Sequence, residues 1–128
     1  MEPRVKHFYG IKLDVTAYPE EVESLLDEQK DPEAALSVHL LRKAGHAVED
    51  GRSSEDELAE KTGMKVLNLG DEELLVIADT VTEVDVWGLT KVDTRPIGLE
   101  EVLKLEQYAR WVGTDVRLGD WFFWVDTD

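Results

Sequence analysis

The first segment of the chain alternates between two kinds of side chain. Apolar or ring-bearing residues occupy every second position from 5 to 15, and an extended chain places all of them on one face. The positions between them hold Lys6, Phe8, Gly10, Lys12 and Asp14. This alternation predicts a half-buried strand whose second face meets solvent.

Helical spacing and capping residues predict four helices in the rest of the chain. They cover residues 19–30, 31–44, 54–63 and 99–112. Pro19 and Asp31-Pro32 are typical of helix starts, and Gly45 and Gly63 are typical of helix ends. Ser54 and Glu57 have the spacing of a capping box for the third helix. The last helix has one apolar face, made of Leu99, Val102, Leu105, Ala109 and Val112.

Strand-forming residues follow in three places. Residues 64–69 and 74–78 are separated by Gly70-Asp71-Glu72-Glu73, which has the composition of a hairpin turn. The strand pattern continues through Val81 and Val84 to Trp87, and a loop is expected over 88–98. Residues 121–125, at the end of the chain, are too few for a helix and rich in strand formers.

The predicted order is therefore β-α-α-α-β-β-α-β. It indicates an α+β fold in which helices pack on one face of a mostly antiparallel sheet, with helices 31–44 and 99–112 giving most of the cover. No repeat or change in composition divides the chain, so we expect residues 1–128 to form a single domain.

Charge narrows the choice of partner. Asp and Glu number 29 against 14 Lys and Arg, which gives a formal net charge of −15. Such a surface repels phosphates and anionic lipids, so we expect neither a nucleic acid nor a membrane as partner. The first residues lack the apolar core of a signal peptide, which favours the cytoplasm.

The sequence offers little for catalysis. It has no cysteine, and its histidines, His7, His39 and His46, lack the spacing that places two imidazoles on one metal ion. No serine lies in a nucleophile elbow, and the glycines form no phosphate loop. We therefore expect no catalytic, cofactor-binding or metal-binding residues, the alternative being a small enzyme whose Asp, Glu and His residues are gathered by the fold.

One segment resembles a DNA-binding family. Residues 36–45 followed by 54–63 resemble the first two helices of a winged helix. That resemblance implies a basic recognition helix next, whereas residues 64–73 are strand-like and acidic. We therefore expect no DNA binding.

The excess of acidic residues calls for an explanation. Many acids occupy predicted first turns of helices, where the helix dipole favours negative charge. Others do not, among them Asp71, Glu72 and Glu73 in the predicted turn. A basic protein partner, mimicry of nucleic acid and adaptation to high salt each account for such an excess.

The aromatic C-terminal strand is the second unusual feature. Trp121, Phe123 and Val125 share one face, and Phe122 and Trp124 share the other. Three apolar residues make a better contribution to a core than two, so we expect the first face to be buried. Phe122 and Trp124 would then be exposed, with Asp120 and Asp126 as an acidic rim. The alternative is a central strand that is covered on both faces.

Together these features predict a non-enzymatic acidic binding protein without a cofactor. Its expected partner is a protein with a basic surface, which it occludes as an inhibitor from a phage or mobile element does, and a second copy is the other partner considered. The expected partner-binding residues are Phe122, Trp124, Asp120, Asp126, Asp71, Glu72 and Glu73.

Overall fold

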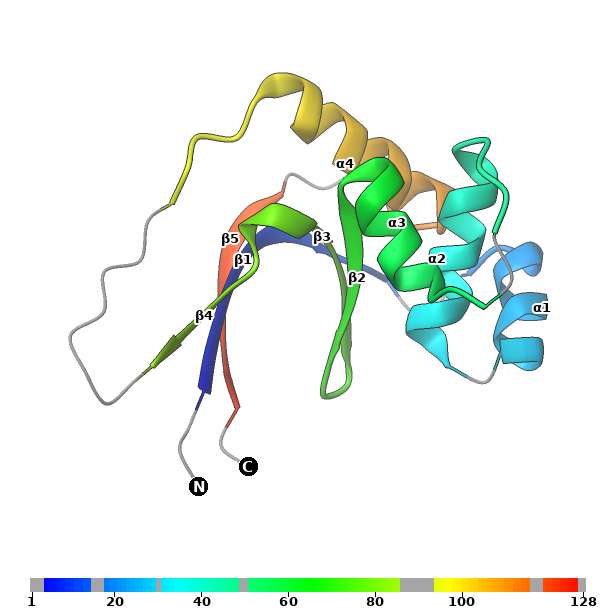
Figure 1. Cartoon of the computed structure of the whole chain (residues 1–128), viewed down its shortest axis with the longest axis horizontal. Helices are drawn as coiled ribbons and strands as arrows, with labels where there is room; N and C mark the ends of the chain where they lie inside the picture. The colour runs from blue at the N-terminus through cyan, green and yellow to red at the C-terminus, as the bar shows by residue number, and fades with distance from the viewer. Residues whose placement is uncertain are drawn as a thin grey trace.

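A computed structural model describes residues 4–14, 18–29, 31–48, 51–85, 94–115 and 119–126 (Figure 1). Its elements are β1 (Arg4–Lys12), α1 (Glu20–Gln29), α2 (Pro32–Lys43), α3 (Ser54–Thr62), β2 (Met64–Leu69), β3 (Glu72–Ile77), the 3-10 helix η1 (Ala78–Thr80), β4 (Thr82–Asp85), α4 (Leu99–Trp111) and β5 (Asp120–Asp126). The predicted α+β class and element order are confirmed, and η1 divides the strand pattern expected to continue from 74–78 toward Trp87 into β3 and β4. Val15, Val86, Trp87 and residues 88–93 of the predicted loop lie outside the described residues.

The antiparallel sheet is built around β1. One edge of β1 pairs with β4 over residues 4–7 and with β3 over residues 10–12. Its other edge pairs with β5 over residues 4–10, and β2 pairs with β3. Gly10 lies opposite Val76, and His7 lies opposite Thr82, so η1 adds residues between the two pairings. The Thr80 Oγ1 atom in η1 accepts a hydrogen bond from the Tyr9 N–H at 3.0 Å, which satisfies this donor where the ladder is interrupted.

Local capping explains where the helices begin and end. The Asp31 side chain accepts a hydrogen bond from the Glu33 N–H at 3.1 Å, and Pro32 occupies the first turn of α2. The predicted cap of α3 was wrong by one residue, because Ser53 accepts from the Asp56 N–H whereas Ser54 Oγ donates to the Ala34 carbonyl. Gly63 ends α3 with a φ of 78°, which favours glycine.

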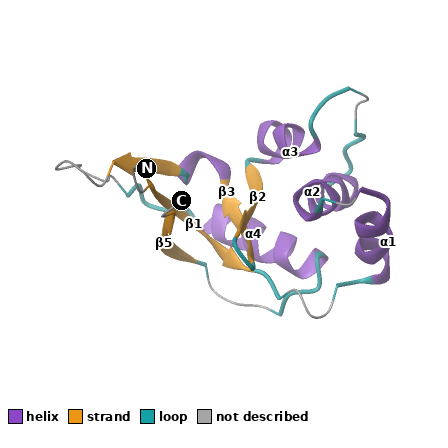
Figure 2. Ribbon diagram, turned by 90° about the horizontal axis from the view of Figure 1, so that it is seen from below, coloured by secondary structure: helices purple, strands orange, loops and turns teal. Residues whose placement is uncertain are grey.

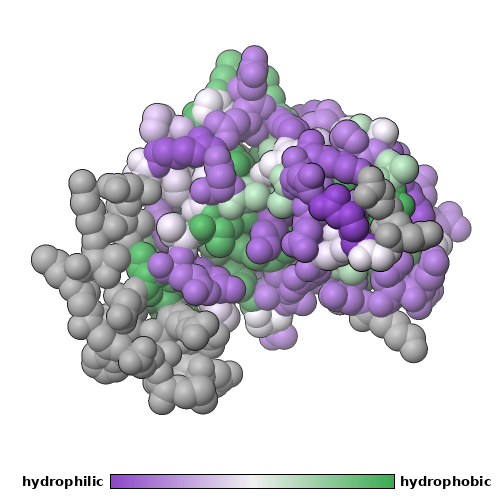
Figure 3. Space-filling view, viewed as in Figure 1, coloured by the Kyte–Doolittle hydropathy of each residue, from purple (hydrophilic) through white to green (hydrophobic). Residues whose placement is uncertain are grey.

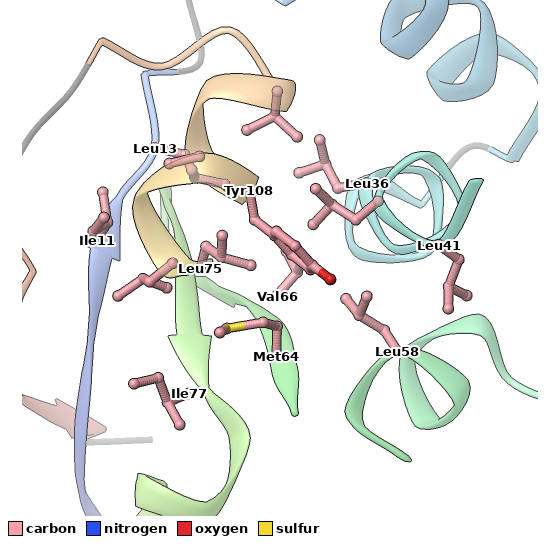
Figure 4. Close-up of a cluster of buried hydrophobic side chains, with 14 of the residues drawn as sticks. Ile11, Leu13, Leu36, Leu41, Leu58, Met64, Val66, Leu75, Ile77 and Tyr108 are labelled. Atoms are coloured by element: carbon pink, nitrogen blue, oxygen red, sulfur yellow. The ribbon is translucent and has the colours of Figure 1, made fainter. Parts of the chain in front are cut away.

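The main core lies between the sheet and α2, α3 and α4 (Figure 4). Residues 35–41 of α2 are all buried, and α1 packs against the outer side of α2 (Figure 2). Tyr108 of α4 points toward Leu58 of α3 and Val66 of β2 (Figure 4). The predicted cover of the sheet by 31–44 and 99–112 is therefore confirmed.

The predicted apolar face of α4 is buried from Leu105 onward, whereas Val102 is only partly buried. Leu105, Ala109 and Val112 are buried, but Leu99 is 72% exposed. Leu99 lies in the first turn of α4, and hydrophobic side chains emerge at that end in Figure 3. Helical periodicity finds the buried face of a helix but not how far along the helix the sheet extends.

The predicted solvent face of β1 was wrong at Phe8, which is 1% exposed. Phe8 belongs to a second apolar cluster on the other face of the sheet, together with Leu67, Leu69, Leu74 and Val76. Phe122 and Trp124 of β5 pack against this cluster. The sheet therefore buries apolar side chains on both faces.

The segment after α3 is a β-hairpin. β2 and β3 are joined by the two residues Gly70 and Asp71, and Gly70 has a φ of 66°. A strand thus follows α3 where the winged-helix resemblance implies a recognition helix. Within the described residues, no helix is both long and apolar enough to cross a lipid bilayer.

Candidate protein-interaction surface

The aromatic strand β5 lies at the edge of the sheet. Among the described residues it pairs only with β1, from Arg4 opposite Asp126 to Gly10 opposite Asp120. Residues directly opposite each other share a face, so Phe123 lies beside His7 and Phe122 beside Phe8. This register decides which aromatic side chains of β5 are covered.

The predicted assignment of the two faces of β5 was wrong. Phe123 is 63% exposed and Val125 is 55% exposed, whereas Phe122 and Trp124 are partly buried against the second cluster. The reason lies in the tertiary packing around the two faces of β5. On the first face, the helices lie away from the lower ends of β1 and β5 (Figure 1), and on the second face Phe8 and its neighbours form an apolar surface that Phe122 and Trp124 cover. The exposed apolar pair of β5 is therefore Phe123 and Val125.

Phe123 also covers a buried histidine. The His7 ring is 1% exposed and stacks on Trp121 and Phe123, with centroid distances of 4.7 and 4.2 Å. Its Nδ1 atom has no hydrogen-bond partner in the described part of the chain. Burial lowers the pKa of His7, so the neutral imidazole is favoured. His7 thus serves as a flat base on which the exposed ring of Phe123 rests.

A small pocket opens on the other face of β5. Its volume is about 200 Å³, and residues of β1, β2, β3 and β5 line it: Phe8, Lys12, Leu69, Glu72, Leu74, Phe122, Phe123 and Trp124. Lys12 and Glu72 form an ion pair with an N–O distance of 3.1 Å. The volume is below the 300–1,000 Å³ typical of small-molecule sites.

The expected binding residues Asp71, Glu72 and Glu73 do not all lie on one surface. Glu72 joins Phe122 and Trp124 around the pocket, and Asp71 is exposed in the neighbouring turn. Glu73 is buried, and its Oε2 atom accepts a hydrogen bond from the Tyr18 hydroxyl at 2.5 Å. Placing Glu73 on the surface was therefore wrong, because alternation along β3 turns it to the face opposite Glu72.

Asp120 is the first residue of β5. It is exposed, and its Oδ1 atom accepts a hydrogen bond from the Trp121 N–H at 2.8 Å. Burial raises the pKa of Tyr9, and the negative charges of Asp120 and Glu106 raise it further. Asp126 lies at the other end of the strand, opposite Arg4, and its side chain is outside the described part.

The other two histidines, His39 and His46, lie in α2 and just after it. His39 is buried, and its Nε2 atom lies 2.7 Å from the Trp111 carbonyl oxygen, so it donates a hydrogen bond that links α2 to α4. His46 is partly exposed just after α2. Across the described residues, no group of three His, Asp or Glu side chains is arranged to hold a metal ion.

No protein-family model, no curated protein and no solved structure matches this chain.

Proposed function

We propose that this chain is a non-enzymatic binding protein that uses β5 to occlude a basic surface of another protein. The observation that carries the proposal is the exposure of Phe123 and Val125 on one face of β5, at the edge of the described sheet. Large exposed apolar side chains within a polar rim are typical of interaction sites. The net charge of −15 favours a basic partner and increases its rate of association.

The proposal extends to a cytoplasmic protein that serves a phage or mobile element as an inhibitor. What supports this extension is the acidity of the chain and the lack of recognisable catalytic motifs in its sequence.

Photo-crosslinking tests the proposal. A photoreactive phenylalanine analogue replaces Phe123 in the full chain, and Leu103 of α4, which is 54% exposed, is the control position. We expect position 123 to crosslink to a basic protein of the source cell in a salt-sensitive manner, and position 103 not to. Equal crosslinking from both positions, or none from position 123, would overturn the proposal.

A further inference from the structure

The backbone of β1 shows which of its residues face away from β5. The Tyr9 N–H donates to Thr80 Oγ1 at 3.0 Å, and the His7 carbonyl accepts from Thr82 Oγ1 at 3.4 Å. Thr80 and Thr82 both lie on the η1–β4 side of β1. Since the N–H and C=O of a strand residue point to the same side, the odd-numbered residues of β1 direct theirs away from β5.

The matching residues of β5 therefore direct their backbone groups outward. Tyr9 lies opposite Trp121 and His7 opposite Phe123, so these are the pairs without mutual hydrogen bonds in the β1–β5 ladder. The Trp121 N–H agrees independently, because it donates to Asp120 Oδ1. By the same alternation, Phe123 and Val125 present their N–H and C=O groups at the open edge of the described sheet.

We propose that β5 binds an extended segment of a partner protein as an additional strand, paired to the backbone of Phe123 and Val125. This inference rests on the proposed function and specifies its mode of binding. Strand addition takes affinity from main-chain hydrogen bonds and specificity from alternate side chains. The residues opposite Phe123 and Val125 share their face, so apolar side chains there cover the two that are exposed.

Charge selects a basic partner over a second copy. β5 has an aspartate at each end, Asp120 and Asp126, and no basic residue. If two copies paired antiparallel about Phe123, Asp120 of each would lie opposite Asp126 of the other, and like charges directly opposite each other destabilise a sheet. A partner segment with lysine or arginine opposite Asp120 and Asp126 is attracted by these aspartates instead of being repelled.

A peptide probe tests strand addition directly. The probe is a labelled seven-residue peptide in which valine and threonine alternate between terminal lysines, and binding is followed by fluorescence anisotropy at low salt. Val125→Pro removes one outward N–H without removing a bond to β1, and Val125→Ala keeps that N–H. We expect Val125→Pro to bind the probe about tenfold more weakly than Val125→Ala, the effect of losing one hydrogen bond.

Two further comparisons keep the test decisive if Val125→Pro does not fold. A probe methylated on the alternate backbone nitrogens that would face β5 cannot donate hydrogen bonds to β5. We expect this probe to lose binding to the wild-type chain. Asp120→Asn keeps the Oδ1 acceptor for the Trp121 N–H and removes the charge, so we expect about threefold weaker binding of the lysine probe. A probe with terminal glutamates is expected to bind more weakly than the lysine probe.

Several outcomes overturn the inference. They are a methylated probe that binds as tightly as its parent, a folded Val125→Pro variant that binds like Val125→Ala, and the absence of probe binding. A dimer that Val125→Pro converts to monomer would identify a second copy as the occupant instead. If probe binding fails while position 123 still crosslinks to a basic protein, strand addition is wrong and the proposed function stands; if crosslinking fails, both are wrong.

Discussion

Truncation of Phe8 and Phe123 tests which faces of β1 and β5 are covered. Phe8 is 1% exposed within the second apolar cluster, so Phe8→Ala is expected to destabilise the fold by about 3–5 kcal/mol, as large-to-small core changes do. Phe123 is 63% exposed. If an aromatic side chain buries about 200 Å² when fully covered, roughly 70 Å² of Phe123 is covered, worth at most about 2 kcal/mol at ~25 cal/mol per Å².

Urea denaturation followed by tryptophan fluorescence and circular dichroism measures both values. We expect Phe8→Ala to lose at least about 1 kcal/mol more than Phe123→Ala. Leu103→Ala, at an exposed helical position, is expected to change the stability little. If Phe8→Ala and Phe123→Ala destabilise equally, the face assignment is wrong. A larger loss from Phe123→Ala would restore the burial expected from the sequence alone.

Three other predictions concern the packing around β1. A Cβ atom at Gly10 would lie 2.5 Å from the Leu75 carbonyl oxygen, so Gly10→Ala should destabilise the fold by about 1–3 kcal/mol in urea melts, and an unchanged midpoint would contradict the close approach. Tyr18→Phe removes the hydroxyl that donates to buried Glu73 and should cost about 1–3 kcal/mol in thermal melts, whereas an exposed Glu73 would predict no loss. Because the folded-state pKa of His7 lies below its usual 6.5, its protonation favours the unfolded chain. Wild type should therefore lose stability relative to His7→Phe as pH falls from 7.5 through 6.5, and urea melts in which it gains stability would contradict this.

Local signals were enough to predict the elements. Asp31-Pro32 gives α2 its first turn, Gly63 ends α3, and Gly70 permits the tight turn between β2 and β3. Each signal acts within a few residues, through a capping hydrogen bond or a positive φ. The order of helices and strands, and hence the α+β class, follows from such signals without knowledge of the tertiary contacts.

The faces of the sheet could not be predicted in the same way. Counting apolar residues on each side of β5 favoured burial of Phe123, but burial depends on where the helices lie along the sheet. Phe8 is the residue that could have indicated the covered face. Alternation from 5 to 15 assigned it to the solvent face of the strand, where it is the one large apolar side chain. Given the β1–β5 register, Phe8 places Phe122 on the covered face.

Glu73 and His7 show a second limit of local pattern. Glu73 stood in a run of acids expected to form an exposed turn, yet the turn is only Gly70 and Asp71, and Glu73 enters the ladder on the inner face. Its partner Tyr18 is distant in sequence, as Trp121 and Phe123 are from His7. Pairings of this kind follow from strand order and register, which the spacing of residue types does not determine.

The acidity of the chain counteracts self-association at the open edge of the described sheet. An exposed strand with large apolar side chains favours edge-to-edge association, and natural sheets oppose this with charges and blocked donors. β5 has charges and a blocked donor, because aspartates lie at its two ends and the Trp121 N–H already donates a hydrogen bond to Asp120 Oδ1. A net charge of −15 on each copy adds repulsion that acts over about 8–10 Å at ordinary ionic strength. The same charges attract a basic segment, so an excess that helix dipoles do not explain both discourages self-pairing and favours the partner proposed for β5.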